Sequence, residues 1–215
     1  MVNLKKVLWV GILLSCICVT SMSFSAAKKP QYPLIAQLES LTTQKENALE
    51  GMLEAIIMLQ NAPQDQNKIL IPWLLQKQKK DTLLAPFTMQ LGSRLFPNNH
   101  KDGLRWFTRG RVRLSYDASR CADPTASQVA VELSVLYGGA LWQYANTHME
   151  EFLNAWQDAI TWEKKHPYSA SPIWLCVQGE KLNMIPEKEW LTIRTQTLQQ
   201  SQDVLKKHFA ELKKQ

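Results

Sequence analysis

Arginine is concentrated in one segment of the chain, and its side chain is the one best suited to binding anions. The segment from Gly103 to Cys121 contains Arg105, Arg109, Arg111, Arg113 and Arg120, whereas lysine is the commoner basic residue elsewhere. A guanidinium offers planar, bidentate donors to a carboxylate or phosphate, which an ammonium group does not. Recognition of a protein or of an anionic envelope component is therefore the first chemistry to consider.

Most of these arginines share one face if the segment is a helix. At 100° per residue, that face contains Arg105, Arg109, Arg113, Arg120, Asp102 and Asp117. The simpler interpretation is a solvated face on which Arg113 and Asp117 pair at i, i+4. The alternative is a face that binds an anionic partner.

Arg111 projects from the opposite, apolar face of the same helix. Its neighbours there include Leu104, Phe107 and Leu114, so its charge is costly to bury unless an acid compensates it. We predict a partly buried ion pair between Arg111 and an acid on a neighbouring helix. The alternative is that Arg111 lines a polar pocket.

Seven tryptophans follow residue 27, and most have the spacing of helical core positions. The alternative to core packing is an aromatic cleft for a glycan or peptide. Trp162, beside Glu163, and Trp174, in an expected loop, are the two candidates for that cleft.

Catalytic and cofactor motifs are missing from the sequence. No two of the four histidines have the i, i+4 spacing of a helical metal site, and eight glycines are too few for several phosphate-binding loops. We therefore predict no catalytic residue, metal ligand or cofactor. A glycan hydrolase needs two opposed carboxylates in a cleft, a distance that sequence does not give.

The first 27 residues have the pattern of a bacterial signal peptide. Lys5 and Lys6 precede an apolar run from Val7 to Val19, which is too short to span a bilayer, and small residues lie before Lys28. Cleavage would leave a periplasmic or secreted protein. Leu13-Leu14-Ser15-Cys16 resembles a lipobox, so the alternative is a membrane-anchored lipoprotein acylated at Cys16.

Removal of this leader changes the charge and the cysteine count. The formal charge falls from +6 to +4 because Lys5 and Lys6 leave without an acid. This mild excess predicts no nucleic-acid partner, and membrane contact only through the leader or a lipid. Cys121 and Cys176 remain, and an oxidising compartment favours one disulfide between them. A reactive thiol and a metal pair are the alternatives.

The remaining chain, residues 28–215, is predicted to be one all-α domain, an irregular bundle of about seven or eight helices. Apolar residues recur at threes and fours, and no stretch alternates as a strand would. We expect helix starts at Asp102, Asp123-Pro124, Thr147 with Glu150 as a capping box, and Pro186, and a helix end at Gly138-Gly139. Residues 167 to 181 are expected to form an ordered loop.

One pattern resembles a family of uncharacterised exported proteins of proteobacteria. It comprises Trp106-Phe107, Gly110, Val112-Arg113, Gly138-Gly139, Phe152, Trp156, Ala159-Ile160, Trp162 and His166-Pro167. The resemblance covers residues 104–167 and implies an exported helical domain, without an activity or a catalytic residue.

Three functions are compatible with these features. The first is a non-enzymatic binding protein of the envelope, acting through its arginine-bearing helix or an aromatic groove. The second is a small hydrolase of envelope polymers, for which a cleft joining perturbed carboxylates to exposed tryptophan would be the sign. The third is a protein secreted to act on a host.

Overall fold

A computed structural model describes residues 32–43, 48–79, 83–181 and 183–214. Tyr32–Gln215 form one compact unit. The expected signal peptide and the candidate lipidation site Cys16 lie outside the described residues. Within the described ranges the chain is helical, with no strand beyond an isolated bridge between Cys121 and Met184. The predicted all-α fold is confirmed.

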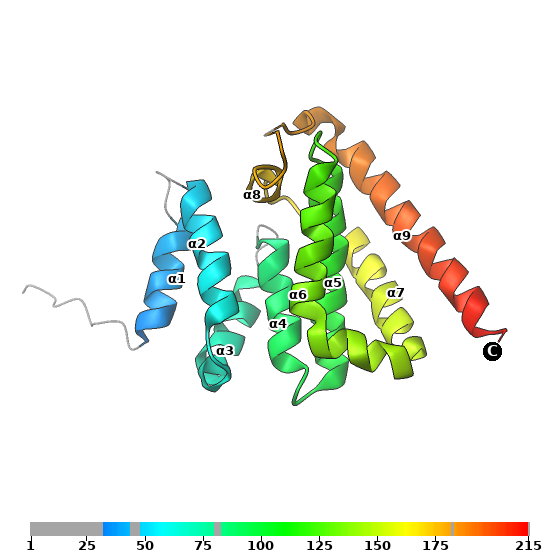
Figure 1. The fold of residues 1–215 in the computed structure, drawn as a ribbon, viewed down its shortest axis with the longest axis horizontal. Helices are drawn as coiled ribbons and strands as arrows, with labels where there is room; N and C mark the ends of the chain where they lie inside the picture. The colour runs from blue at the N-terminus through cyan, green and yellow to red at the C-terminus, as the bar shows by residue number, and fades with distance from the viewer. Residues whose placement is uncertain (1–31, 44–47, 80–82, 182, 215) are drawn as a thin grey trace, which may run out of the picture. The chain divides into compact units, whose positions relative to one another are not determined.

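The described residues form nine α-helices and two short 3-10 helices (Figure 1). In chain order these are α1 (Pro33–Thr43), α2 (Ala48–Asn61), η1 (Gln64–Gln66), α3 (Asn67–Lys77), α4 (Ala85–Leu95), α5 (His100–Ser119), α6 (Thr125–Thr147), α7 (Met149–Lys165), α8 (Ile173–Cys176), η2 (Glu187–Glu189) and α9 (Trp190–Leu212).

Helix α5, which carries the arginines, is the central element and packs against α4, α6, α7 and α9. Its closest neighbour is α4, and glycines make that approach possible. A Cβ atom on Gly110 would lie 2.6 Å from the backbone nitrogen of Met89, and one on Gly103 would lie 2.6 Å from the Cα of Phe96. A larger residue at either position would push the two helices apart.

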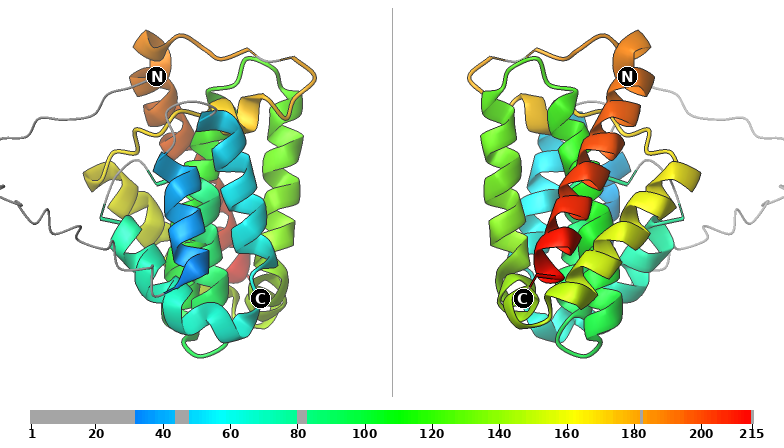
Figure 2. Two further views of the ribbon diagram at one scale, coloured as in Figure 1. Left: turned by 90° about the vertical axis from the view of Figure 1, so that its left-hand side faces the viewer. Right: turned by 90° about the vertical axis from the view of Figure 1, so that its right-hand side faces the viewer.

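The C-terminal helix α9 crosses α5 and α7, as the right-hand view of Figure 2 shows. It buries Thr197, Leu198 and Leu205 and leaves most of its polar residues in solvent. This amphipathic division is what the apolar spacing of the sequence predicts. One consequence is that His208, near the end of α9, lies beside residues of α5, α6 and α7.

Several expected helix starts differ in detail from the structure. At α6 the N-cap is Pro124, which was expected to be the first helical residue. The N-cap of α5 is Asn99, whose side-chain oxygen accepts a hydrogen bond from the backbone nitrogen of Asp102 at 3.0 Å, so Asp102 is not the cap. At the start of α7 no capping box forms. The hydroxyl of Thr147 instead donates to the carbonyl of Tyr144, because α6 continues as far as Thr147.

Helix α6 does not end at Gly138-Gly139 as expected. A mid-helix glycine disfavours a helix by only about 1 kcal/mol relative to alanine, which tertiary packing readily offsets. Gly138 is buried, and a Cβ atom there would collide with Trp142 and lie 2.8 Å from the ring of Phe107. The glycine therefore makes room for aromatic side chains within a continuous helix.

The predicted disulfide joins Cys121, directly after α5, to Cys176 at the end of α8. The S–S distance is 2.04 Å and the Cα atoms are 5.2 Å apart. The expected loop at residues 167–181 contains α8, so part of it is one helical turn. The bridge fixes this turn against the end of the arginine-bearing helix.

Candidate functional site

Four of the buried charged side chains lie on or next to α5 and α7, and we call them the buried charge cluster. They are Arg113, Asp117 and Arg120, at or just beyond the C-terminal half of α5, and Glu163 on α7. Their side chains are at most 2% exposed. The predicted solvated face is therefore wrong for the C-terminal half of this helix.

The pairing in this cluster differs from the expected one. Arg113 Nε donates to Glu163 Oε2 at 3.0 Å, and Asp117 pairs with Arg120, so the predicted pair of Arg113 with Asp117 does not form. The cause is the packing of α7 against α5, which brings Glu163 to Arg113. A pair across two helices is not visible in the spacing of one helix.

Asp117 is completely buried and accepts hydrogen bonds from two aromatic side chains. The hydroxyl of Tyr168 and the indole nitrogen of Trp174 each donate to its Oδ2 at 3.1 Å. Burial raises the pKa of Asp117 to about 7, against the opposing effects of Arg120 and of these donors. Burial likewise raises the pKa of Glu163, against the opposing charge of Arg113.

Aromatic rings cover the two buried guanidinium groups. Arg113 lies 4.6 Å from the ring centroid of Trp162 and 4.7 Å from that of Tyr168. Arg120 lies 4.1 Å from Tyr116 and 4.5 Å from Trp190. Several of their nitrogens have no acceptor, so ring faces supply part of the compensation that hydrogen bonds do not. These charges are held by the protein's own groups.

A second arrangement surrounds Arg111, and we call it the Arg111 cavity. It has a volume of about 330 Å³ and lies where α5, the end of α6, the start of α7 and α9 meet. The lining residues are Arg111, Trp142, Ala145, Asn146, Met149, Phe152, Leu153, Trp156 and His208. The wall is mainly apolar, and no acid contributes to it.

Arg111 lies against the indoles of this wall. Its guanidinium carbon is 4.5 Å from the ring centroid of Trp142 and 5.4 Å from that of Trp156. Among the described residues it makes no ion pair, so the predicted pair with an acid is wrong. The alternative is correct only in part, since Arg111 lines a pocket whose wall is mainly apolar and not polar.

Burial of the Arg111 side chain shifts the pKa of its guanidinium. It lowers the pKa of the guanidinium to about 10, which leaves the group positively charged at neutral pH. Tryptophan faces attract such a cation through their quadrupole, by about 0.5–2 kcal/mol depending on desolvation. The indoles thus hold Arg111 in place without neutralising it.

The sequence did not point to Trp142 and Trp156 as partners of Arg111. Their rings belong to a continuous aromatic set in which Trp142 contacts Phe107 and Phe152, and Phe152 contacts Trp156. The set forms because α6 runs past Gly138 and turns directly into α7. The expected end of α6 at the glycine pair obscured this junction.

The other predicted residues have different surroundings. Arg105 pairs with Asp102 at 2.9 Å on the surface. Arg109 lies between Trp106 and Trp162, with centroid distances of 4.8 and 4.5 Å, and burial lowers its pKa to about 10, with smaller effects of neighbouring charges. Trp162 is therefore covered by guanidinium groups.

Trp174 is an interior residue. Its side chain is 1% exposed, and its indole nitrogen donates to Asp117 in the buried charge cluster. The predicted aromatic cleft does not include it in this structure. The tryptophans that do border a cavity with Arg111 are Trp142 and Trp156.

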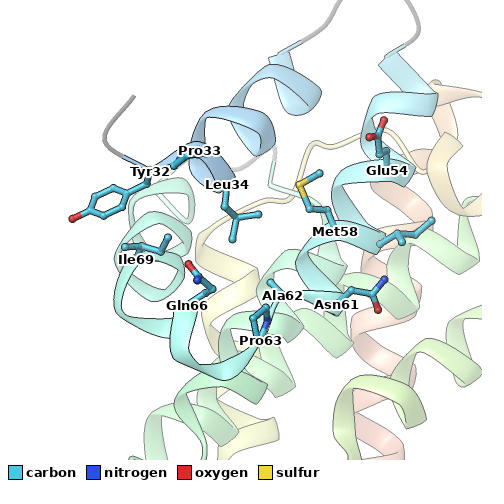
Figure 3. Close-up of a pocket in the computed structure, with 11 residues that line it drawn as sticks. Tyr32, Pro33, Leu34, Glu54, Met58, Asn61, Ala62, Pro63, Gln66 and Ile69 are labelled. Carbon is cyan, nitrogen blue, oxygen red and sulfur yellow. The ribbon is translucent and has the colours of Figure 1, made fainter. Parts of the chain in front are cut away.

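A larger cavity of about 620 Å³ lies among α1, α2, η1 and α3. Figure 3 shows Leu34, Met58 and Ile69 around it, with Glu54 at one side. Its wall is largely apolar and contains no basic residue. The arginines of α5 therefore have no part in it.

A smaller cavity of about 230 Å³ lies along α5 and α7 and has charges of both signs. Lys101 and Arg105 line it together with Glu151 and Asp158. A further cavity, of about 170 Å³, also has a cation beside a tryptophan, Lys77 and Trp73, but Lys77 pairs with Glu39. Among these four cavities, only the one around Arg111 combines tryptophan walls with a cation that makes no ion pair among the described residues.

Two further features bear on function. Within the described ranges, no group of three or more His, Cys, Asp or Glu side chains is arranged to hold a metal ion, and no helix is both long and apolar enough to cross a membrane. Comparisons of the chain with protein-family models, curated proteins and solved structures gave no match. The resemblance to exported proteobacterial proteins stays a prediction.

Proposed function

We propose that the protein is an exported, non-enzymatic binding protein of the bacterial envelope, and that it holds its partner through the Arg111 cavity. Export is supported by the leader pattern of residues 1–27. A periplasmic or secreted location follows from cleavage of that leader, and lipidation at Cys16 is the alternative.

The observation that carries the proposal is the charge of Arg111, which makes no ion pair among the described residues. A guanidinium in an apolar wall needs a counter-charge or access to solvent, and no acid lines the cavity. The cavity gives the group access from outside. An anionic group of a partner is the counter-charge that fits.

A small hydrolase is the alternative from another class. Its chemistry needs two opposed carboxylates in a cleft. The two acids whose pKa values are raised, Asp117 and Glu163, are paired with arginines in the interior. No observation in the described residues favours the hydrolase over the binding protein. A host-directed protein is the third hypothesis, which recovery from culture supernatant instead of the periplasm would favour.

Site-specific photo-crosslinking in cells tests the binding proposal. A photoreactive amino acid at Asn146, which is exposed and lines the cavity, reports on its occupant. The matched position is Gln128, exposed on the same helix and outside the cavity. We expect adducts at Asn146 that Arg111→Met abolishes and Arg105→Met leaves unchanged. Identical adducts at both positions, or adducts insensitive to Arg111→Met, would contradict the proposal.

A further inference from the structure

We infer that the ligand of the Arg111 cavity is a molecule with a single carboxylate on an apolar body, of the medium-chain alkanoate class. The inference rests on the proposed function and assigns a ligand chemistry to the same site. It follows from the part of the guanidinium that is free, from the charges around the cavity and from the nature of its wall.

The planar guanidinium of Arg111 decides how an anion can approach it. Trp142 and Trp156 lie against the group, and its N–H donors all point outward in its own plane. The indole nitrogen of Trp142 is already used, because it donates to the carbonyl of Ser134 at 3.0 Å. An acceptor must therefore meet an edge of Arg111, which is the in-plane, bidentate geometry of a carboxylate.

The charge around the cavity matches one negative charge better than two. Arg111 is its one arginine, and the other polar lining residues are Asn146 and His208. The Nδ1 atom of His208 lies 3.4 Å from Oε2 of Glu211, so any positive charge on its ring is met by that carboxylate. A phosphate monoester brings close to two charges and three acceptor oxygens, more than these groups can satisfy.

The mainly apolar wall of the Arg111 cavity favours a ligand with an apolar body. Met149, Phe152 and Leu153 offer no donor in their side chains, and the one acceptor among them is the weakly accepting thioether of Met149. A peptide would bring backbone amides into this surface, and polar groups that lose water without gaining a partner weaken binding. An alkyl chain has no such groups. A volume of about 330 Å³ lies at the small end of ligand sites, which suits a medium chain.

Isothermal titration calorimetry of the purified protein with a matched set of probes tests the inference. The probes are decanoate, decanol, decyl phosphate, acetate, and acetyl-Leu-Phe with a free C-terminal carboxylate, each below any micellar concentration. We expect decanoate to bind at least about tenfold more tightly than each of the others, because it alone matches both the charge and the wall.

Two variants connect that binding to Arg111. Arg111→Met removes the charge and keeps an apolar side chain, and we expect it to weaken decanoate at least about tenfold while decanol changes little. Arg105→Met removes an equal charge from the same helix outside the cavity and should leave decanoate unchanged. If Arg111→Met does not fold, the ranking of probes on the unaltered protein still decides.

Several outcomes would overturn the inference. Equal binding of decanoate and decanol would show that the cavity does not recognise the negative charge of the ligand. Tighter binding of decyl phosphate or of the peptide would assign the ligand to another class. Arg111-dependent crosslinks at Asn146 together with any of these results would leave the proposed binding function intact. Absence of those crosslinks while decanoate still binds would instead contradict the proposed function and leave the inferred ligand chemistry intact.

Discussion

Arg111 and Arg113 lie two residues apart on α5 and have opposite surroundings. Arg113 has a completely buried side chain, a carboxylate partner 3.0 Å away and two aromatic rings over its plane. Arg111 is half-buried, also lies against aromatic rings, and borders a cavity without an acid. The aromatic contacts are shared, so the difference is the carboxylate and the cavity.

That difference separates two uses of a buried cation. In the buried charge cluster, Glu163 and Asp117 compensate the arginines, and removing one partner leaves a charge stranded in the interior. In the Arg111 cavity the compensation comes from indole faces and from the opening, so the guanidinium edge stays available. We therefore expect the cluster to govern stability and the cavity to govern binding.

The largest expected effect is that of Asp117→Ala. This change strands Arg120 and removes the acceptor of Tyr168 and Trp174. We expect the free energy of unfolding to fall by about 3–5 kcal/mol, as for other broken buried pairs, measured by urea denaturation followed by circular dichroism. The control is Asp102→Ala, which breaks a surface pair and should change it by less than about 1 kcal/mol. Similar losses in both variants would contradict the expectation that breaking the interior pair lowers the free energy of unfolding more than breaking a surface pair.

The disulfide lies at the C-terminal end of α5, next to the buried charge cluster, so removing it tests whether the cluster and the Arg111 cavity are independent. Cys121 directly follows Arg120, whereas the Arg111 cavity lies toward the α6–α7 junction. Replacing both Cys121 and Cys176 by serine should lower the free energy of unfolding by about 2–4 kcal/mol. The affinity for decanoate should stay within about twofold of the unaltered value. A large loss of that affinity would mean that the two regions are not independent.

The pH dependence of stability gives a smaller, specific signal from Asp117. Burial raises its folded-state pKa from 3.8 to about 7, so the folded protein holds this proton more tightly than the unfolded chain. The stabilisation is complete below about pH 4 and is lost as the pH rises through about 7. Between pH 5 and 8 we expect a loss of at least about 1 kcal/mol, one pKa unit in energy, measured by urea denaturation at each pH.

The matched variant for this measurement is Asp117→Asn, which cannot ionise at this position. Glu163, whose pKa is raised in the same direction, is present in both proteins and does not affect their difference. We expect the slope of stability against pH to be shallower in the Asp117→Asn variant than in the unaltered protein. Parallel slopes would show that Asp117 is ionised in the folded protein across this range.

The sequence was sufficient to predict the fold class and the disulfide. Helical spacing specifies which face of each helix is apolar, and the two cysteines after the expected signal peptide leave one pairing. It was also sufficient to single out Arg111, because a charge within an apolar stripe is visible in one helix. The continuation of α6 through Gly138 was not predictable, since it depends on contacts with Phe107 and Trp142.

The partners of the arginines could not be predicted from the sequence, for a related reason. Glu163 reaches Arg113 from α7, and Trp174 and Tyr168 reach Asp117 from the segment that follows. These contacts depend on how helices cross, which periodicity within one helix does not determine. Helical-wheel reasoning assigned the charges to solvent because it had no neighbouring helix to place over them.

The most direct test of the difference between the two arginines is the free energy of unfolding of Arg111→Met compared with that of Arg113→Met, measured by urea denaturation under one set of conditions. We expect Arg113→Met to lose about 3–5 kcal/mol, because Glu163 is then buried without its main partner. Arg111→Met should change by about 1 kcal/mol or less, the scale of its cation–π contacts. An equal and large loss in both variants would contradict the assignment of Arg111 to binding.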